Sequence, residues 1–548
     1  MPAEFDSLVM ACEQVSASIG FWKSARLICI LAIACMACKE NKETKTGSQQ
    51  PIKESMLSGQ ELATVHCGRC HSLVDPSELP RSSWKNDVLP SMGHRMGIYK
   101  GDHQPDSLFD QGISGTVVRR ANIYPEQAVL AKEDWNKIVS YYLSNAYDTI
   151  LPPKKDKRPK NFLKHFKYRE VMYSHRPALT SLVKILPGNR GIVYSDGKLN
   201  KSILTFLTSD LQKNYDIPFP TTPISYYEKS DTLYLTMAGN GVFPNDIPAG
   251  SLQKISKSKN SKTYDRAKVV LTKMQRPVHM AYGDLDNDGD EDIVACEYGD
   301  LTGKLVWFQN MGHDRYLEKS LRGTPGAIGA VIKDVDKDGF NDIIVLMAQG
   351  DEGVFLYTNK KNGFFTERRL LSFSPLNGSQ YIELADFNKD GFDDLIYVSG
   401  DNADLTPILK QHHGIYIFLN DGEFNFTQRW FYQLNGAYKA MARDYDLDGD
   451  LDIAAISFFP DYHNYPEESF VYLENKGNLK FVDYSFPQST NGRWIVMDAA
   501  DMDADGDVDI ALGSFVYFTP QGDTTGLGKK WLTAGPSVIV LENTSRHR

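Results

Sequence analysis

Cysteine is scarce in this chain, which has 7 cysteines among 548 residues. Four of them precede residue 40, two form the pair Cys67 and Cys70, and Cys296 lies alone in an apolar run. A scaffold held by disulfides needs cysteines spread through its whole sequence. The sequence therefore excludes a disulfide-stabilised fold.

Positive charge is not in excess either, because the formal net charge is −10. This balance excludes the basic surface that is typical of nucleic-acid-binding proteins. Of 70 acidic residues, 23 are aspartates in five short loops, so the negative charge is concentrated there. The chain has no Ser/His/Asp nucleophile elbow, no phosphate-binding loop and no zinc motif. Its length predicts two or more domains.

Residues 1–38 have the organisation of an export signal. Lys23 and Arg26 supply positive charge before the apolar stretch Leu27–Ala34, which is too short to span a bilayer. This order is typical of a cleaved signal peptide. An uncleaved anchor is the alternative interpretation, and Met10 is an alternative start of translation.

The end of this signal resembles the lipobox of bacterial lipoproteins, in which a small residue precedes a cysteine after an apolar run. Ala37 precedes Cys38, and the polar residues 39–55 begin directly after it. The resemblance implies acylation of Cys38, with Cys35 as the alternative, although neither has leucine three residues earlier. It implies an exported lipoprotein that is anchored to a membrane and faces the periplasm or the cell surface. Residues 39–55 are lysine-rich and predict a flexible tether.

The sequence Cys67-Gly-Arg-Cys70-His71 has the C-x-x-C-H spacing of covalent haem c attachment. Two cysteines three residues apart can bond the two vinyl groups of one porphyrin as thioethers. The histidine that follows is then held under the iron as the proximal ligand. A redox dithiol or half of a zinc site would be the alternatives, but there is no second cysteine pair.

The sequence around this motif predicts helices. Ser58-Gly-Gln-Glu61 is a capping box that opens a helix leading into the motif, and residues 132–143 place Trp135 and Tyr142 on one helical face. A first helix with C-x-x-C-H and a last helix with aromatic residues resembles the small all-α class I cytochrome c domain, here over residues 56–150.

The cytochrome c resemblance implies a methionine as the distal haem ligand. Met92 follows Leu-Pro and is the first candidate, with Met96 as the alternative. His94 lies between them and would give a bis-histidine haem of lower potential. A proline-rich, charged segment at residues 151–161 then predicts a linker to the next domain.

After the linker, a nine-residue acidic loop recurs five times, beginning at Asp284, Asp334, Asp386, Asp444 and Asp501. Each of these Asp loops has oxygen-bearing side chains at positions 1, 3, 5 and 9 and glycine at position 6, an arrangement that calcium favours. The predicted ligands of up to five calcium ions are Asp284, Asp286, Asp288, Asp292, Asp334, Asp336, Asp338, Asp342, Asp386, Asn388, Asp390, Asp394, Asp444, Asp446, Asp448, Asp452, Asp501, Asp503, Asp505 and Asp509.

The sequence on either side of each Asp loop predicts strands, because apolar, β-prone residues such as Ile343 and Leu395 follow directly. Position 12 is never the glutamate that an EF-hand requires. Each copy then offers two more strands around an Asn/Gly turn, and four strands make one propeller blade. The copies resemble the FG-GAP/VCBS repeats of integrin-like β-propellers.

The whole of residues 162–548 is predicted to be an all-β propeller. Residues 178–219 and 223–271 add two four-strand patterns without Asp loops, which gives seven blades. The last copy lacks a fourth strand, whereas residues 162–172 resemble one. We therefore predict that residues 162–172 pair antiparallel with residues 537–543, close the ring and hold the haem domain beside the last blade.

Several loops between the second and third strands are long and rich in aromatic residues and histidine, and they lie on the face opposite the Asp loops. Such a face can form a binding surface, or its side chains can simply cover one another. The residues concerned are Phe243, His412, His413, Phe459, Tyr462, His463, Tyr465, Tyr517, Phe518 and Trp531.

These features lead to one main functional hypothesis. The chain is expected to be an exported haem c electron carrier whose calcium-braced propeller binds a redox partner protein or a small substrate. One alternative is a propeller oxidoreductase that acts on a small molecule or sugar and passes electrons to its own haem. The other alternative is adhesion to a glycan or a surface through the aromatic face.

Overall fold

The chain is known from a computed structural model, which describes residues 52–100, 105–155, 157–198, 200–258, 264–361, 363–402, 408–520 and 523–547. The predicted signal peptide, Cys35, Cys38 and most of the tether lie outside these ranges. Within the ranges, no helix is both long enough and apolar enough to cross a membrane.

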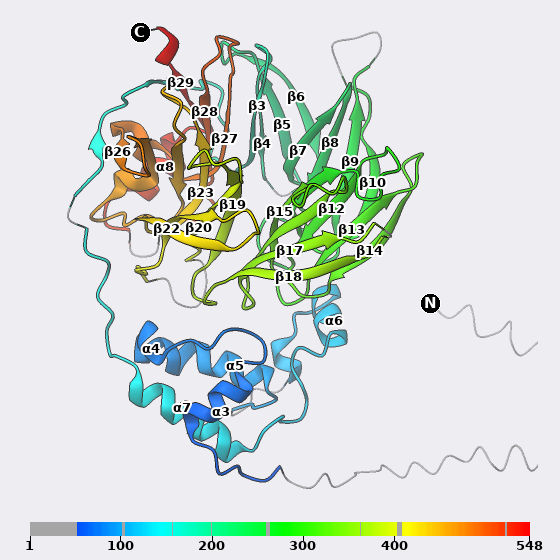
Figure 1. Ribbon diagram of the computed structural model, residues 1–548, viewed down its shortest axis with the longest axis vertical. Helices are drawn as coiled ribbons and strands as arrows, with labels where there is room; N and C mark the ends of the chain where they lie inside the picture. Colours follow the sequence, from blue (N-terminus) through cyan, green and yellow to red (C-terminus); the bar gives the residue numbers. More distant parts are fainter. Residues whose placement is uncertain are drawn as a thin grey trace, which may run out of the picture. The chain divides into compact units, whose positions relative to one another are not determined.

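Helices occupy the first part of the described chain (Figure 1). They are α3 (Gly59–His66), α4 (Arg81–Ser83), α5 (Leu89–Arg95), α6 (Ile113–Arg120) and α7 (Lys132–Asn145), with 3-10 turns at η1 (Pro76–Glu78) and η3 (Pro105–Leu108) and a π-helical turn at η2 (Trp84–Val88). The predicted capping box is confirmed, since Ser58 and Glu61 bond each other's backbone N–H groups. The helix predicted over residues 132–143 is also confirmed.

Helices α3 and α7 cross in close contact. A Cβ atom on Gly59 would lie 2.2 Å from the backbone oxygen of Lys137 and 2.8 Å from the Cβ of Tyr141, so only glycine fits at the crossing. Trp135 and Tyr142 of α7 are buried in the core of this region. The periodicity of the last helix therefore identified its buried face correctly.

The rest of the chain forms seven four-stranded antiparallel sheets, the blades of a seven-bladed β-propeller (Figure 1). Blade 1 comprises β3 (Thr180–Leu186), β4 (Gly191–Asp196), β5 (Ser202–Leu207) and β6 (Lys213–Phe219). Blade 2 comprises β7 (Pro223–Lys229), β8 (Thr232–Met237), β9 (Gly250–Ser256) and β10 (Lys268–Met274). Blade 3 comprises β11 (Pro277–Gly283), β12 (Asp292–Glu297), β13 (Lys304–Asn310) and β14 (Tyr316–Arg322).

The last four blades follow the same order. Blade 4 comprises β15 (Ala327–Lys333), β16 (Asp342–Met347), β17 (Gly353–Asn359) and β18 (Phe365–Ser372); blade 5 comprises β19 (Ser379–Ala385), β20 (Asp394–Ser399), β21 (Gly414–Asn420) and β22 (Phe426–Gln433). Blade 6 comprises β23 (Ala437–Arg443), β24 (Asp452–Ser457), β25 (Phe470–Asn475) and β26 (Phe481–Ser485); blade 7 comprises β27 (Trp494–Ala500), β28 (Asp509–Ser514), β29 (Val538–Asn543) and β2 (Phe166–Glu170). The predicted propeller and its seven blades are confirmed.

Burial explains why the second strand of each blade reads as a continuous apolar run. Every residue of β12, β16, β20, β24 and β28 is buried, because a neighbouring blade covers each face of the sheet. The outer strand β18 is mostly exposed. The core of the propeller therefore lies between successive blades.

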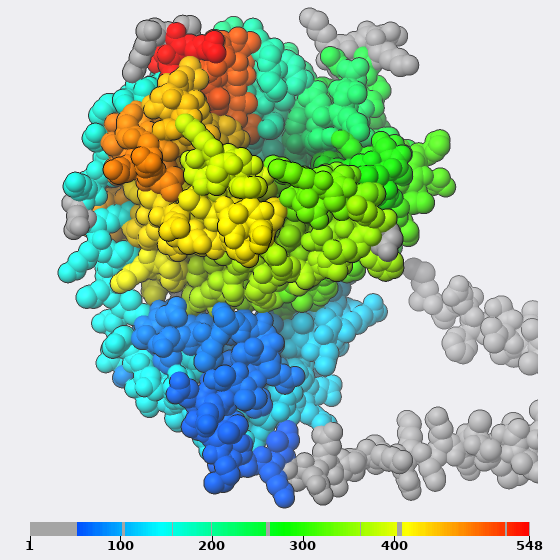
Figure 2. All heavy atoms as spheres, in the orientation of Figure 1, coloured from blue at the N-terminus to red at the C-terminus, as the bar shows by residue number. Residues whose placement is uncertain are grey.

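Strand β2 closes the ring from the N-terminal side. It pairs antiparallel with β29, from Phe166 opposite Asn543 to Glu170 opposite Ile539, which confirms the predicted closure. A further strand was not predicted: β1 (Lys160–Asn161) pairs parallel with β26 in blade 6. We call residues 160–170 the clasp. Figure 2 shows cyan atoms from this part of the chain against the orange atoms of the late blades.

The segment before the clasp also contacts blade 6. Lys155 forms a 2.6 Å ion pair with Glu468, and the side chain of Glu468 is only 1% exposed. The predicted linker 151–161 is therefore attached to the propeller at its second half. The described contacts of the helical region involve Phe373, Leu376 and Ile408, which lie next to or within blade 5, rather than the last blade as expected.

Candidate functional site

The five Asp loops share one backbone conformation. Each joins the innermost strand of a blade to the second strand, in blades 3 to 7. The glycine at position 6 has φ between 87° and 91° in all five loops, a region in which other residues are strained. Its N–H donates to the carboxylate at position 1, as in the 2.9 Å bond from Gly289 to Asp284. The repeated sequence pattern thus encodes a repeated turn.

The aspartate at position 9 holds each loop to the next strands. In blade 3, Asp292 accepts hydrogen bonds from the N–H of Leu285 at 3.1 Å and from that of Asn310 at 2.6 Å. Equivalent bonds from the asparagine that ends the third strand reach Asp342, Asp394, Asp452 and Asp509. The sequence pattern predicts Asn310, Asn359, Asn420 and Asn475 only as turn residues and Asn543 only as the end of a strand.

Carboxylate oxygens converge in four of the loops, with ligand atoms within 4.8 Å of one another. The converging sets are Asp284, Asp286 and Asp292; Asp334, Asp336 and Asp342; Asp444, Asp446 and Asp452; and Asp501, Asp503 and Asp505. The loop that begins at Asp386 has the amide Asn388 at position 3, which donates to Asp390 at 2.8 Å. Asp288 and Asp338 at position 5 are exposed, and Lys361 pairs with Asp338 at 3.1 Å.

The converging oxygens fit a bound cation. Buried oxygens of Asp284, Asp286 and Asp444 have no hydrogen-bond partner. Burial raises the pKa of Asp292 to about 6 and that of Asp452 to about 7, because a carboxylate without a counter-charge is costly away from water. Several buried aspartate triads of this form are typical of FG-GAP calcium sites.

Residues 284–345, 334–397 and 444–512 match the family model described as the FG-GAP-like repeat. The propeller carries FG-GAP-like repeats. Each match runs from the first residue of one Asp loop through the next Asp loop, so the three matches together include all five loops. They agree with the resemblance drawn from the sequence.

Three solved structures of other proteins align with most of this chain's length. They are an Agrocybe aegerita lectin described as recognising non-reducing terminal N-acetylglucosamine (15% identity, 66% of this chain and 98% of the lectin, TM-score 0.37), the N-terminal domain of Nup159 (11%, 71% and 99%, 0.40) and Saccharomyces cerevisiae Sqt1 (10%, 70% and 99%, 0.41). These similarities are too distant to bear on function. None of the curated proteins matches the chain.

The C-x-x-C-H motif lies at the end of α3. Cys67 is 9% exposed and belongs to the core of the helical region, whereas Cys70 is exposed. Burial, followed by the nearby Cys70, raises the pKa of the Cys67 thiol to about 11. The ring of His71 lies with Nδ1 2.8 Å from the carbonyl oxygen of Ser72. A carbonyl can only accept, so Nδ1 carries the proton and Nε2 keeps a lone pair for a metal.

The candidate distal ligands lie on or beside α5. Met92 is within the helix and Met96 directly follows its last residue, and both pack against the core that contains Cys67. The ring of His94 stacks on that of Tyr99 with centroids 5.8 Å apart. Cys67, Met92 and Met96 thus contribute to one hydrophobic cluster.

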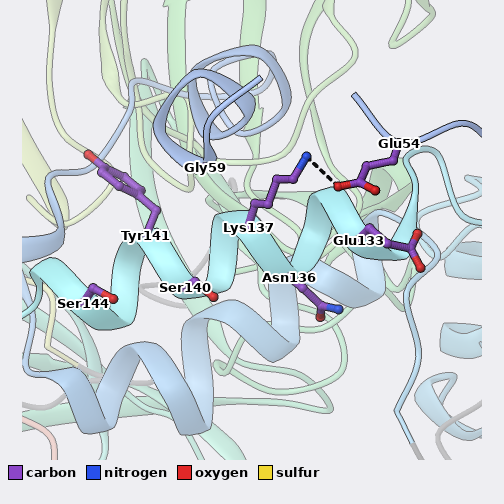
Figure 3. A pocket seen from close by; sticks show the side chains of 8 residues that line it. All are labelled: Glu54, Gly59, Glu133, Asn136, Lys137, Ser140, Tyr141 and Ser144. Carbon is purple, nitrogen blue, oxygen red and sulfur yellow. Dashed lines mark ion pairs between the residues drawn. The ribbon is translucent and has the colours of Figure 1, made fainter. Parts of the chain in front are cut away.

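A shallow pocket lies beside α7, on the side where Glu54 forms a 2.9 Å ion pair with Lys137 (Figure 3). Gly59 and Tyr141 also line it, together with serine and asparagine side chains. The lining contains no cysteine, histidine or methionine. The pocket is therefore separate from the predicted haem ligands.

The long loops opposite the Asp loops do not form one continuous aromatic surface. Trp531 and His413 are each 1% exposed, and the ring of Trp531 packs against that of Tyr462 with centroids 5.4 Å apart. Phe243, Tyr517 and Phe518 remain 40 to 63% exposed, and the rings of Phe243 and Tyr517 are 4.7 Å apart. For the buried members, this agrees with the second of the two interpretations, in which the side chains cover one another.

Proposed function

We propose that this protein is an exported carrier of one haem c, and that its calcium-stabilised propeller binds a redox partner protein or a small substrate. The observation on which the proposal rests is the placement of C-x-x-C-H after α3, with Nδ1 of His71 donating to Ser72 and Nε2 available to iron. The close crossing of α3 and α7 at Gly59 supports the cytochrome c resemblance.

Each residue of the site has a distinct role in this proposal. Cys67 and Cys70 bond the porphyrin, His71 is the proximal ligand, and Met92 is the distal ligand with Met96 as the alternative. Haem iron, when bound there, supplies reversible one-electron transfer. Cys67 is buried, and the partly buried side chains of Met92 and Met96 pack against the same apolar core, which limits the access of water from that side.

Calcium binding by the Asp loops is the second part of the proposal. The unpartnered, buried oxygens of Asp284 and Asp444 support it, since a divalent cation offsets their charge. Each loop joins the inner strand of a blade to its buried second strand, so a bound ion stabilises the blade itself. It does not stabilise the long loops on the opposite face of the propeller.

Anchoring to a membrane through acylated Cys38, or Cys35, is the third part, and it rests on the lipobox resemblance alone. Export is consistent with the haem, because c-type haem is attached outside the cytoplasm. A lipid anchor would keep the haem domain near membrane-bound redox partners.

The helical region contacts the propeller close to the proposed haem. The hydroxyl of Ser72, directly after His71, donates to the backbone oxygen of Phe373 at 3.1 Å. Leu376 and Ile408 pack against the core that contains Cys67. This contact supports a function in which haem and propeller serve the same partner.

The test is covalent haem staining of the full chain after production in a host that attaches haem c. Cys67→Ala with Cys70→Ala should abolish the stain, whereas Cys296→Ala, which removes the buried thiol of β12, should keep it. Retention of covalent haem in the double variant would disprove the haem assignment.

A second candidate function is oxidation of a small molecule by the propeller, with the haem as electron outlet. The polar side chains of the innermost strands favour it, because they include the buried Asp498 and the half-buried Lys439. Steady-state oxidation assays with sugars, alcohols and hydroxy acids, read as haem reduction, distinguish it from simple electron transfer.

A further inference from the structure

The innermost strands of the seven blades share one register. In each, a bulge follows the first residue, and the third residue then pairs with the second strand at the same level. These third residues form a ring around the axis of the propeller. They are Leu182, Ser225, His279, Gly329, Tyr381, Lys439 and Val496.

Two members of this ring reach the backbone of the following blade in the same way. Nε2 of His279 lies 3.0 Å from the carbonyl oxygen of Ala330, and Nζ of Lys439 donates to the carbonyl oxygen of Met497 at 2.8 Å. The proton of His279 therefore lies on Nε2, and its Nδ1 is an acceptor. Both side chains are half-buried although their strands are the innermost ones, so solvent reaches them along the axis.

The neighbouring charges at the next level are already paired. Lys184 forms a 3.1 Å ion pair with Asp498, and Arg443 pairs with Glu383. Lys439 differs: among the described residues, no carboxylate oxygen lies within 4.0 Å of its Nζ, whose hydrogen-bond partner is a neutral carbonyl. On the innermost strands of the described chain, Asp498 and Glu383 thus pair with Lys184 and Arg443, and the positive charge of Lys439 has no carboxylate of its own.

The same ring of third residues contains open space. A Cβ atom on Gly329 would have no atom within 4 Å, so the ring has a gap at blade 4. The ring of Tyr381 lies 5.2 Å from Nζ of Lys439. Burial, together with the charge of Lys439, lowers the pKa of His279, although these residues belong to blades 3 and 6. Both side chains belong to the ring of third residues and are half-buried on innermost strands, so they line the same axial space.

We propose that this axial space is a binding site for a small carboxylate anion. The ammonium group of Lys439 is its counter-charge, and the gap at Gly329 accommodates its carbon atoms. An unpaired cation shielded from bulk water binds an anion more strongly than a solvated lysine does. Nδ1 of His279 accepts a hydrogen bond from a hydroxyl group, which favours hydroxy acids. This inference rests on the second candidate function, because the site would bind the small molecule that the propeller oxidises. Binding of the anion itself does not require the haem.

The test uses the full chain and measures binding of lactate and acetate by calorimetry. Both anions should bind, lactate more tightly, and methylammonium should not. Lys439→Met should weaken lactate binding at least tenfold. The control is Lys333→Met, which removes a half-exposed lysine of β15 that pairs with Asp393, and this variant should bind lactate as the unmodified protein does. Equal binding by Lys439→Met and the unmodified protein, or no binding of either anion, would overturn the proposal.

A second variant keeps the test independent of the lysine. Gly329→Val fills the open space without altering any charge and should also weaken lactate binding at least tenfold, with the circular dichroism spectrum unchanged. Unaltered lactate binding in folded Gly329→Val would overturn the location of the site. Repeating the titration in Cys67→Ala/Cys70→Ala should give the same affinity, so that failure of the haem assignment is distinguished from failure of the axial site.

Discussion

Arg169 of β2 forms an ion pair with Glu542 of β29, so a residue from before the first blade holds the last strand of the chain. The backbone pairing around it runs from Phe166 opposite Asn543 to Glu170 opposite Ile539. Nearby, the backbone oxygen of His165 accepts from the N–H of Thr544 at 2.8 Å. The two ends of the propeller thus close the ring without a disulfide.

Phe166→Ala should destabilise the propeller by about 3–5 kcal/mol, because it leaves a cavity in a buried aromatic cluster that joins blades 6 and 7. Phe162→Ala is the matched control, since Phe162 is 51% exposed on the same clasp and should cost much less. Urea unfolding followed by tryptophan fluorescence measures both. Equal midpoints for the two variants would contradict the role of the clasp.

Removal of calcium should lower the melting temperature of the propeller. At a calcium concentration 100 times the dissociation constant, each site contributes about 2.7 kcal/mol to stability. Differential scanning calorimetry with calcium and with a chelator measures the effect, and the helical region should melt unchanged. Asp444→Asn should remove one site from the binding stoichiometry, whereas Asp231→Asn, in the corresponding turn of blade 2, should not. An unchanged melt with chelator would exclude a structural role for calcium.

Glu352 should make the stability of the propeller fall as the pH rises. Burial raises its pKa from 4.5 to about 7, and the side chain is 3% exposed between the backbone of Gly378 and that of Ser379. The folded state binds the proton more tightly than the unfolded state, so this group's contribution is present below pH 4.5 and is lost as the pH rises towards 7. The loss is about 3 kcal/mol at most.

Glu352→Gln imitates the protonated form and should flatten this pH dependence. Urea midpoints between pH 4.5 and pH 8, with calcium present throughout, measure the difference between variant and unmodified protein. Glu423→Gln, an exposed turn residue of blade 5, is the control. Parallel profiles for Glu352→Gln and the unmodified protein would show that this carboxyl does not titrate with folding.

Met92→Ala should remove the weak near-infrared charge-transfer band of a methionine-ligated oxidised haem, while Met96→Ala should leave it. Met92 lies within α5, whereas Met96 follows the last residue of that helix. Near-infrared absorption of the oxidised protein measures the band. The reverse pattern would assign the distal position to Met96, and absence of the band from the unmodified protein would favour His94.

The sequence by itself determined the elements whose signals are local. Spacing over a few residues predicts the capping box at Ser58, the buried face of α7 and the turn conformation of the Asp loops. The number of blades follows from counting the four-strand patterns along the chain. Closure of the ring was also predictable, because the last repeat lacks a strand and residues 162–172 supply one. The haem, the calcium ions and the lipid anchor are predictions of the same local kind that await experiment.

Only the tertiary structure decided which distant side chains meet. His279, Gly329 and Lys439 lie in three different repeats, and nothing in their local sequence indicates that they share the axis. Likewise, nothing in the local sequence distinguishes the buried Trp531 from the exposed Tyr517. Such contacts depend on how the blades pack around the ring, since a long-range contact has no periodicity along the chain.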